Sequence, residues 1–235
     1  MTSFNPQRLM VVHAHPDDET IFTGHIIAHA LRADAEVKLV TLTRGERGNA
    51  RNPNLRSLND NPKEMANYRS NALLEAVAAF DGLEQSFFGT RSYLETDQDS
   101  TGLGKIFDRD PLYPLTLTGS GVTVVAEELV PVLKRFRPDT VVTLSRKNQH
   151  SDHKMAFKAV RKAIKMLKTS RPPKHFVVLE SGESAEIRIG DDHTAAIKRQ
   201  AMRSYENFIT INEKTFDFGT GEIKFSEQEK LRLVR

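Results

Sequence analysis

The fold is decided by the stretch R-L-M-V-V-H-A-H-P-D-D-E, residues 8–19. Residues 8–15 form a short apolar run with β-branched side chains, which is typical of a buried strand. Helical spacing of apolar residues begins soon afterwards, over residues 20–31. A buried strand that leads directly into a helix is the opening of a βαβ unit, so this stretch predicts a parallel sheet.

The same alternation of strands and helices continues along the chain. Further strands are expected at residues 36–43, 85–88, 140–145 and 175–180, and further helices at residues 63–80, 122–136, 152–167 and 192–206. Beyond residue 206 the pattern is typical of hairpin or coil. No internal repeat or linker divides the chain, which predicts a single α/β domain over residues 1–235 with a mostly parallel central sheet.

Residues 90–120 break this alternation. They are rich in Gly, Asp, Ser, Thr, Tyr and Pro and show little periodicity. A loop of this length inside a compact domain usually serves a function, so we predict a lid or specificity loop. Its aromatic residues Tyr93, Phe107 and Tyr113 are candidates for stacking on a sugar.

Composition excludes several classes of protein. The chain has no cysteine, which rules out disulfides, thiolate metal ligands and a cysteine nucleophile. Its apolar runs are too short to span a membrane and no signal peptide is evident, so we expect a cytoplasmic protein. The 34 basic residues nearly balance the 31 acidic ones, and the basic stripe within 154–174 is typical of the solvated face of a helix. Nucleic acid is therefore not an expected partner.

Two clusters of metal-donor residues follow predicted strands. H-P-D-D-E at residues 15–19 comes after the first strand, and H-S-D-H at residues 150–153 follows the strand at 140–145. In an open α/β sheet, ligands bind in the crevice at the carboxyl ends of the strands. We therefore expect the two clusters to meet there and form a metal site.

The residue types suit metal-assisted hydrolysis. A catalytic zinc takes three ligands from imidazoles and carboxylates and keeps one position open, which His15, Asp18 and His153 would satisfy. Water bound there loses its proton more easily, and Asp17 is the adjacent candidate for the general base. His150 is a candidate to stabilise the oxyanion or move a proton. Ferrous iron would accept the same ligands.

Each cluster also has a purely structural interpretation. Asp17 or Asp18 could cap the helix that follows, and Asp152 could cap the helix after the second cluster. His25 and His29 stand four residues apart on a predicted helix, but without a third donor we expect them to face neighbours or solvent. For His13 we favour a structural or outer-shell role beneath the site.

The sequence resembles the PIG-L/LmbE family of zinc-dependent N-acetylglucosaminyl deacetylases. The resemblance rests on A-H-P-D-D-E after the first strand and on H-x-D-H much later. T-R-G-E-R-G at residues 43–48 is similar to a family stretch, as are Tyr68-Arg69 and the late helix at 195–205. Similarity covers about residues 8–90 and 122–206 of the chain.

The resemblance implies a Rossmann-like three-layer sandwich and assigns roles to individual residues. His15, Asp18 and His153 match the family's metal ligands, Asp17 its general base and His150 its second histidine. In addition, it implies that Arg69 contacts the substrate. Family members remove an acetyl group from an N-acetylated sugar or cut a related amide.

Three positions depart from the family pattern. Ala72 stands where many members carry an acidic residue, and Thr90, Arg91 and Ser92 follow Gly89 where many have Gly-x-x-Asp. Tyr205 replaces the glutamine that usually follows the serine of the late helix. The metal ligands are retained, whereas the positions that recognise the sugar are altered.

The sequence therefore predicts a zinc-dependent hydrolase of linear amide bonds that removes an N-acetyl or other N-acyl group from an amino-sugar-containing small molecule. One alternative is an amide hydrolase for a non-sugar conjugate. Another is a nucleotide-binding Rossmann module without catalysis, although His-Pro-Asp-Asp occupies the place of a G-x-G-x-x-G loop. A third is an inactive metal-binding relative. The oligomeric state, a homo-oligomer included, is left open.

Overall fold

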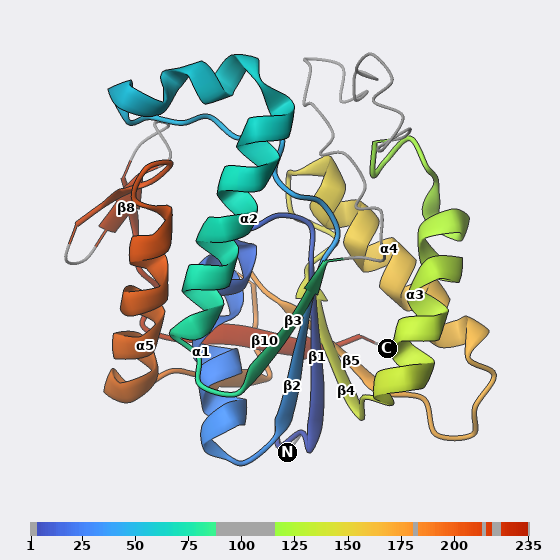
Figure 1. Cartoon of the computed structure of the whole chain (residues 1–235). Helices are drawn as coiled ribbons and strands as arrows, with labels where there is room; N and C mark the ends of the chain where they lie inside the picture. Colours follow the sequence, from blue (N-terminus) through green and yellow to red (C-terminus); the bar gives the residue numbers. More distant parts are fainter. Residues whose placement is uncertain (1–3, 88–115, 181–182, 213–214, 218–221, 235) are drawn as a thin grey trace.

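The computed structural model describes residues 4–87, 116–180, 183–212, 215–217 and 222–234 (Figure 1). Most of the predicted specificity loop, with its three aromatic residues, lies outside the described residues. Its last part, residues 116–120, forms a turn that leads into a helix.

A seven-stranded sheet forms the centre of the molecule, in the order β3-β2-β1-β4-β5-β10-β6. Its strands are β1 (Arg8–His13), β2 (Glu36–Thr41), β3 (Leu83–Phe87), β4 (Thr140–Leu144), β5 (Lys174–Val178), β6 (Ile187–Ile189) and β10 (Glu229–Leu233). The strands from β3 to β5 run parallel, as predicted. From β1 the chain builds outward to β2 and β3, and then returns to the other side of β1 for β4. The switch point of the sheet therefore lies between β1 and β4.

Helices cover both faces of this sheet and make three layers (Figure 1). They are α1 (Asp18–Arg32), α2 (Pro62–Ala78), α3 (Val122–Phe136), α4 (Ser151–Met166) and α5 (Asp192–Met202). The helices α1, α2 and α5 share one apolar core with the sheet, whereas α3 and α4 close the other face. This arrangement confirms the predicted α/β sandwich. Among the described helices, none is long and apolar enough to cross a membrane.

The end of the chain is more ordered than the sequence predicted. The strands β7 (Thr210–Ile211), β8 (Thr215–Asp217) and β9 (Glu222–Lys224) form a small antiparallel sheet. By contrast, β10 enters the main sheet antiparallel to both β5 and β6. Its E-K-L-R-L sequence buries Glu229 and Leu231 and leaves Lys230, Arg232 and Leu233 partly exposed. This strand was not predicted, because a charged residue, Glu229, stands at a buried position where an apolar residue is expected.

Two short 3-10 helices were also missed. The first, η1 (Pro53–Asp60), follows the β2 loop, and its Asn52 side chain accepts a hydrogen bond from the Asn54 N–H at 3.0 Å. The second, η2 (Arg203–Tyr205), continues from the end of α5, inside the single helix that was expected at 192–206.

A buried ion pair joins α5 and β10 to the first turns of α1. Lys198 Nζ lies 2.7 Å from Glu229 Oε1 and donates to the Ile21 carbonyl at 2.7 Å. The Glu229 carboxylate accepts the backbone N–H groups of His25 at 3.1 Å and Ile26 at 2.9 Å. Both charged side chains are almost fully buried, with exposures of 3% and 2%. Each charge therefore depends on the other and on the α1 backbone.

We expect Lys198→Met to lower the free energy of unfolding by about 3–5 kcal/mol, because it leaves the Glu229 carboxylate buried without a counter-charge. Chemical denaturation monitored by circular dichroism measures the effect. Lys162→Met is the matched control, since Lys162 hydrogen bonds Thr123 at an exposed site. Equal stability of the two variants would contradict this role for the pair.

Candidate metal centre and active site

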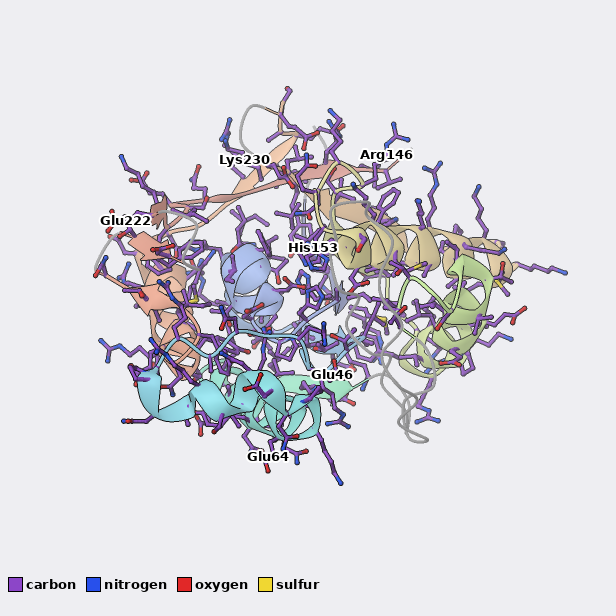
Figure 2. All side chains as sticks on the ribbon, turned by 90° about the horizontal axis from the view of Figure 1, so that it is seen from above. Glu46, Glu64, Arg146, His153, Glu222 and Lys230 are labelled. Carbon is purple, nitrogen blue, oxygen red and sulfur yellow. The ribbon has the colours of Figure 1, made fainter. Side chains whose placement is uncertain are left out.

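The two donor clusters meet at the carboxyl edge of the sheet, beside the switch point. Residues 14–17 connect β1 to α1, and residues 145–150 connect β4 to α4. Figure 2 looks down on this edge, and His153 lies near the middle of the view, at the start of α4. The predicted convergence is therefore present in the structure.

Three of the predicted side chains form a compact set of donors. His15 Nδ1 lies 3.2 Å from His153 Nε2. Asp18 reaches both rings, with Oδ1 3.0 Å from His153 Nε2 and Oδ2 3.5 Å from His15 Nδ1. All three residues are buried. Burial acts to raise the pKa of the Asp18 carboxyl, but its contacts with His153 and His15 hold it well below its usual value.

His150 lies beside this set and is half-buried. Its ring centroid is 4.6 Å from that of His15 and 4.9 Å from that of His153. One ring nitrogen from each of the three histidines can be chosen so that all lie within 4.8 Å of one another, which is a spacing that can hold a metal ion. The structure therefore contains two overlapping donor sets, one completed by Asp18 and one by His150.

Two further side chains orient the histidine rings. His15 Nε2 lies 3.2 Å from Asp152 Oδ2, and His153 Nδ1 lies 2.8 Å from Asn148 Oδ1. These contacts leave His15 Nδ1 and His153 Nε2 directed at Asp18. Oxygen acceptors of this kind fix the tautomer and orientation of metal-binding histidines. Sequence reasoning missed both roles, although H-S-D-H and the N-Q-H before it already hold these residues.

The helix-capping interpretations are wrong for these aspartates. Asp17 is the N-cap residue of α1, but its side chain makes no capping hydrogen bond, and Asp18 is already inside the helix. At the second cluster the N-cap is His150, whose Nδ1 accepts the Asp152 N–H at 3.2 Å. Asp152 itself is fully buried against His15.

Asp17 is held in an unusual conformation beside the donor set. Its φ of 101° lies in a region that non-glycine residues rarely adopt, and such strain is frequent at active sites. Its Oδ2 accepts a hydrogen bond from Arg69 Nη2 at 2.8 Å. Burial raises the pKa of the Asp17 carboxyl to about 8, although the Arg69 guanidinium acts to lower it. A divalent cation beside Asp17 would lower this pKa further.

Arg69 is buried under the Asp17 loop, where it also donates to the Pro16 carbonyl. Two glycines make room for it. A Cβ atom at Gly45 would lie 2.7 Å from Arg69 Nε, and one at Gly48 would lie 2.7 Å from Nη1. The R-G-E-R-G loop thus serves to admit this arginine. Contact between Arg69 and a substrate stays a prediction, whereas its contacts with Asp17 and the Pro16 carbonyl are present in the structure.

Two of the remaining histidines of the N-terminal segment, His13 and His25, have structural partners. His13 Nε2 lies 2.8 Å from the Thr23 hydroxyl, and burial lowers the pKa of His13 to about 4. His25 lies 2.8 Å from the Thr194 hydroxyl and 2.9 Å from the Ser226 carbonyl. His29 is half-buried on α1. The contacts of His13 and His25 agree with the expected structural roles.

Comparison with known proteins agrees with the motifs. The family model of PIG-L, described as GlcNAc-PI de-N-acetylase, matches residues 10–164. A 1D-myo-inositol 2-acetamido-2-deoxy-alpha-D-glucopyranoside deacetylase from Thermobifida fusca (strain YX) is 33% identical over 163 residues, which is 68% of this chain and 55% of that protein. The chain spans about half the length of the curated relatives it matches.

Solved structures share the fold at low sequence identity. N,N'-diacetylchitobiose deacetylase from Pyrococcus horikoshii has a TM-score of 0.64 and 14% identity, over 97% of this chain and 84% of that one. GalB, a 4-carboxy-2-hydroxymuconate hydratase from Pseudomonas putida KT2440, has a TM-score of 0.60 and 16% identity, over 97% and 96%. The fold therefore supports more than one reaction, and the family assignment comes from the sequence match, which includes both donor clusters. The chain belongs to the PIG-L family.

Proposed function

We propose that this protein is a metal-dependent amide hydrolase that removes an N-acetyl, or other N-acyl, group from an amino-sugar-containing small molecule. The observation that carries the proposal is a buried carboxylate, Asp17, held by Arg69 next to the donor set of His15, Asp18 and His153. The T. fusca relative is named as a deacetylase of an acetamido-sugar joined to inositol, which supports this substrate class.

We assign the metal to His15 Nδ1, His153 Nε2 and the Asp18 carboxylate. Their separations of 3.0–3.5 Å resemble the edge of a tetrahedron around zinc, about 3.3 Å for metal–nitrogen bonds of about 2.0–2.1 Å. Held by these three residues, such an ion would polarise the amide carbonyl and lower the pKa of bound water. Zinc suits this mixed nitrogen and oxygen set, and ferrous iron would also accept it.

The other residues of the site then have defined tasks. Asp17 removes the proton of the attacking water and later returns a proton to the leaving amine. Arg69 holds the Asp17 carboxylate in place through its 2.8 Å hydrogen bond. His150 stabilises the negative charge that develops on the carbonyl oxygen, a task for a positioned hydrogen-bond donor. The products are acetate and a free amine.

Acetate and primary amine released by the zinc-loaded protein test the proposal, with N-acetylglucosamine linked to inositol and to simple aglycones as substrates. N-acetylated amines without a sugar form the second panel, and apo protein prepared with a chelator is the control. We expect metal-dependent release from the sugar panel. Release from only the second panel would move the function to a non-sugar conjugate. Thermal stabilisation by nucleotides, without hydrolysis or bound metal, would favour the nucleotide-binding alternative.

A further inference from the structure

Asp17 is held in place at two points, its carboxylate and its backbone N–H. Arg69 binds the carboxylate, whereas the Asp17 N–H donates to Glu19 Oε2 at 3.0 Å. Because the backbone at Asp17 has a φ of 101°, its amide needs a partner to stay in this orientation. Glu19 is fully buried on the first turn of α1 and supplies that partner.

The Glu19 carboxylate is in turn held by a residue from the far end of the chain. The Tyr205 hydroxyl donates to Glu19 Oε1 at 2.8 Å, and the Thr20 hydroxyl donates to the same oxygen at 2.6 Å. Tyr205 and Glu19 both have exposures of 0%. A buried carboxylate that loses a donor must reorient toward another one, since leaving it unsatisfied is costly. Tyr205 and Thr20 together therefore fix which way the Glu19 carboxylate faces Asp17.

One short segment, residues 203–209, contacts both residues that hydrogen bond to Asp17, Arg69 and Glu19. Tyr205 ends η2, and its carbonyl accepts the N–H groups of Phe208 at 2.9 Å and Ile209 at 3.0 Å. The Phe208 ring lies under Arg69, with 5.4 Å from the guanidinium carbon to the ring centroid. The segment 203–209 thus contacts Arg69 through one side chain and Glu19 through another.

We propose that Tyr205 is a positioning residue for Asp17, acting through the Glu19 carboxylate. The chain of contacts runs from the Tyr205 hydroxyl to Glu19 and from Glu19 to the backbone N–H of Asp17. The proposal rests on the proposed function, in which Asp17 is the general base. It also gives a role to a position at which this sequence departs from the family pattern.

Tyr205→Phe removes only the hydroxyl. We expect kcat to fall by about 10–100-fold, the usual effect of losing an outer partner of a catalytic site. KM should stay within about twofold and the metal content should not change, because neither the substrate nor the metal ligands lose a contact. Tyr68→Phe is the matched control, since its hydroxyl accepts from Asn207 Nδ2 in the same segment without leading to Asp17. This control should keep wild-type kcat.

A double-mutant cycle separates positioning from a general structural role. In an Asp17→Asn background, Tyr205→Phe should cost little further kcat, because the residue through which it acts is already disabled. An equal loss in both backgrounds, or unchanged kcat in the single variant, would overturn the proposal. If Tyr205→Phe does not fold, Glu19→Gln replaces it in the same double-mutant cycle, because glutamine keeps the shape of the Glu19 side chain.

The backbone amide of Asp17 gives a readout that does not need activity. In the zinc-loaded protein, its proton chemical shift and exchange rate report the hydrogen bond to Glu19, and both should change in Tyr205→Phe but not in Tyr68→Phe. If no substrate is hydrolysed and this amide still responds, the proposed function fails and the positioning contact stands. If hydrolysis occurs and neither the amide nor kcat responds, only the positioning proposal fails.

Discussion

Asp18→Ala is expected to abolish metal binding and, with it, amide hydrolysis. Asp18 contacts both histidines of the proposed ligand set, at 3.0 Å and 3.5 Å, so its loss removes the carboxylate and the charge that attracts the cation. Loss of an outer partner already costs about 10–100-fold in metal affinity or activity, and loss of a direct ligand should exceed this. Metal content by mass spectrometry and acetate release measure the two effects.

His150→Ala distinguishes the two overlapping donor sets. If His15, Asp18 and His153 hold the metal, this variant keeps about one ion per chain, as expected for a site with three protein ligands, and loses activity only. Loss of metal from His150→Ala but not from Asp18→Ala would instead assign the ion to the three histidines that lie within 4.8 Å. Asp192→Ala removes an exposed carboxylate on α5, and it is the control for the loss of negative charge in Asp18→Ala.

Asp17→Asn is expected to separate metal binding from catalysis. The amide can still accept the hydrogen bond from Arg69 but cannot take a proton from water. General acid–base catalysis contributes about 10²–10⁴-fold, so kcat should fall within this range. Metal content should stay at the wild-type value, because the donor atoms of His15, Asp18 and His153 are unchanged. Acetate release and metal analysis on the same sample measure both quantities.

The result for Asp17→Asn is interpreted by comparison with Asp18→Ala. The two aspartates are neighbours, yet one variant should lose the metal and the other should keep it. Activity of Asp17→Asn within a few-fold of wild type would mean that another group accepts the proton. Loss of metal from Asp17→Asn would place this carboxylate among the ligands.

Local sequence patterns were sufficient to predict the parallel strands of the sheet and the edge of the sheet at which the site lies. The apolar strands β1 and β4 are buried on both faces, and strands of this kind have continuous apolar sequences that are easily recognised. The first donor cluster begins two residues after β1, and the second follows β4 after the loop at residues 145–149. The carboxyl ends of parallel strands share one edge, so their meeting could be predicted without knowing any distance. The paired motifs also led correctly to the PIG-L family.

The partners of the site residues were decided by the tertiary structure. The contact between Arg69 and Asp17, in the space left by Gly45 and Gly48, was not predicted. The predicted contact of Arg69 with a substrate stays a prediction. Local patterns do not report this contact, because the residues come from three separate segments that meet only after the sheet has formed. The same holds for Tyr205, which lies 186 positions from Glu19.

The sequence by itself determined which donor atoms follow which strands, and therefore the edge of the sheet at which they meet. Which nitrogen of His15 faces Asp18, and which aspartate is held by Arg69, depended on side chains packed from elsewhere in the chain. β10 also needed the tertiary structure, because its buried Glu229 is stable only with Lys198 of α5 and the backbone of α1 as partners. A buried charge is stable only where the folded structure supplies its partners, and the sequence around the charged residue does not show which residues these are.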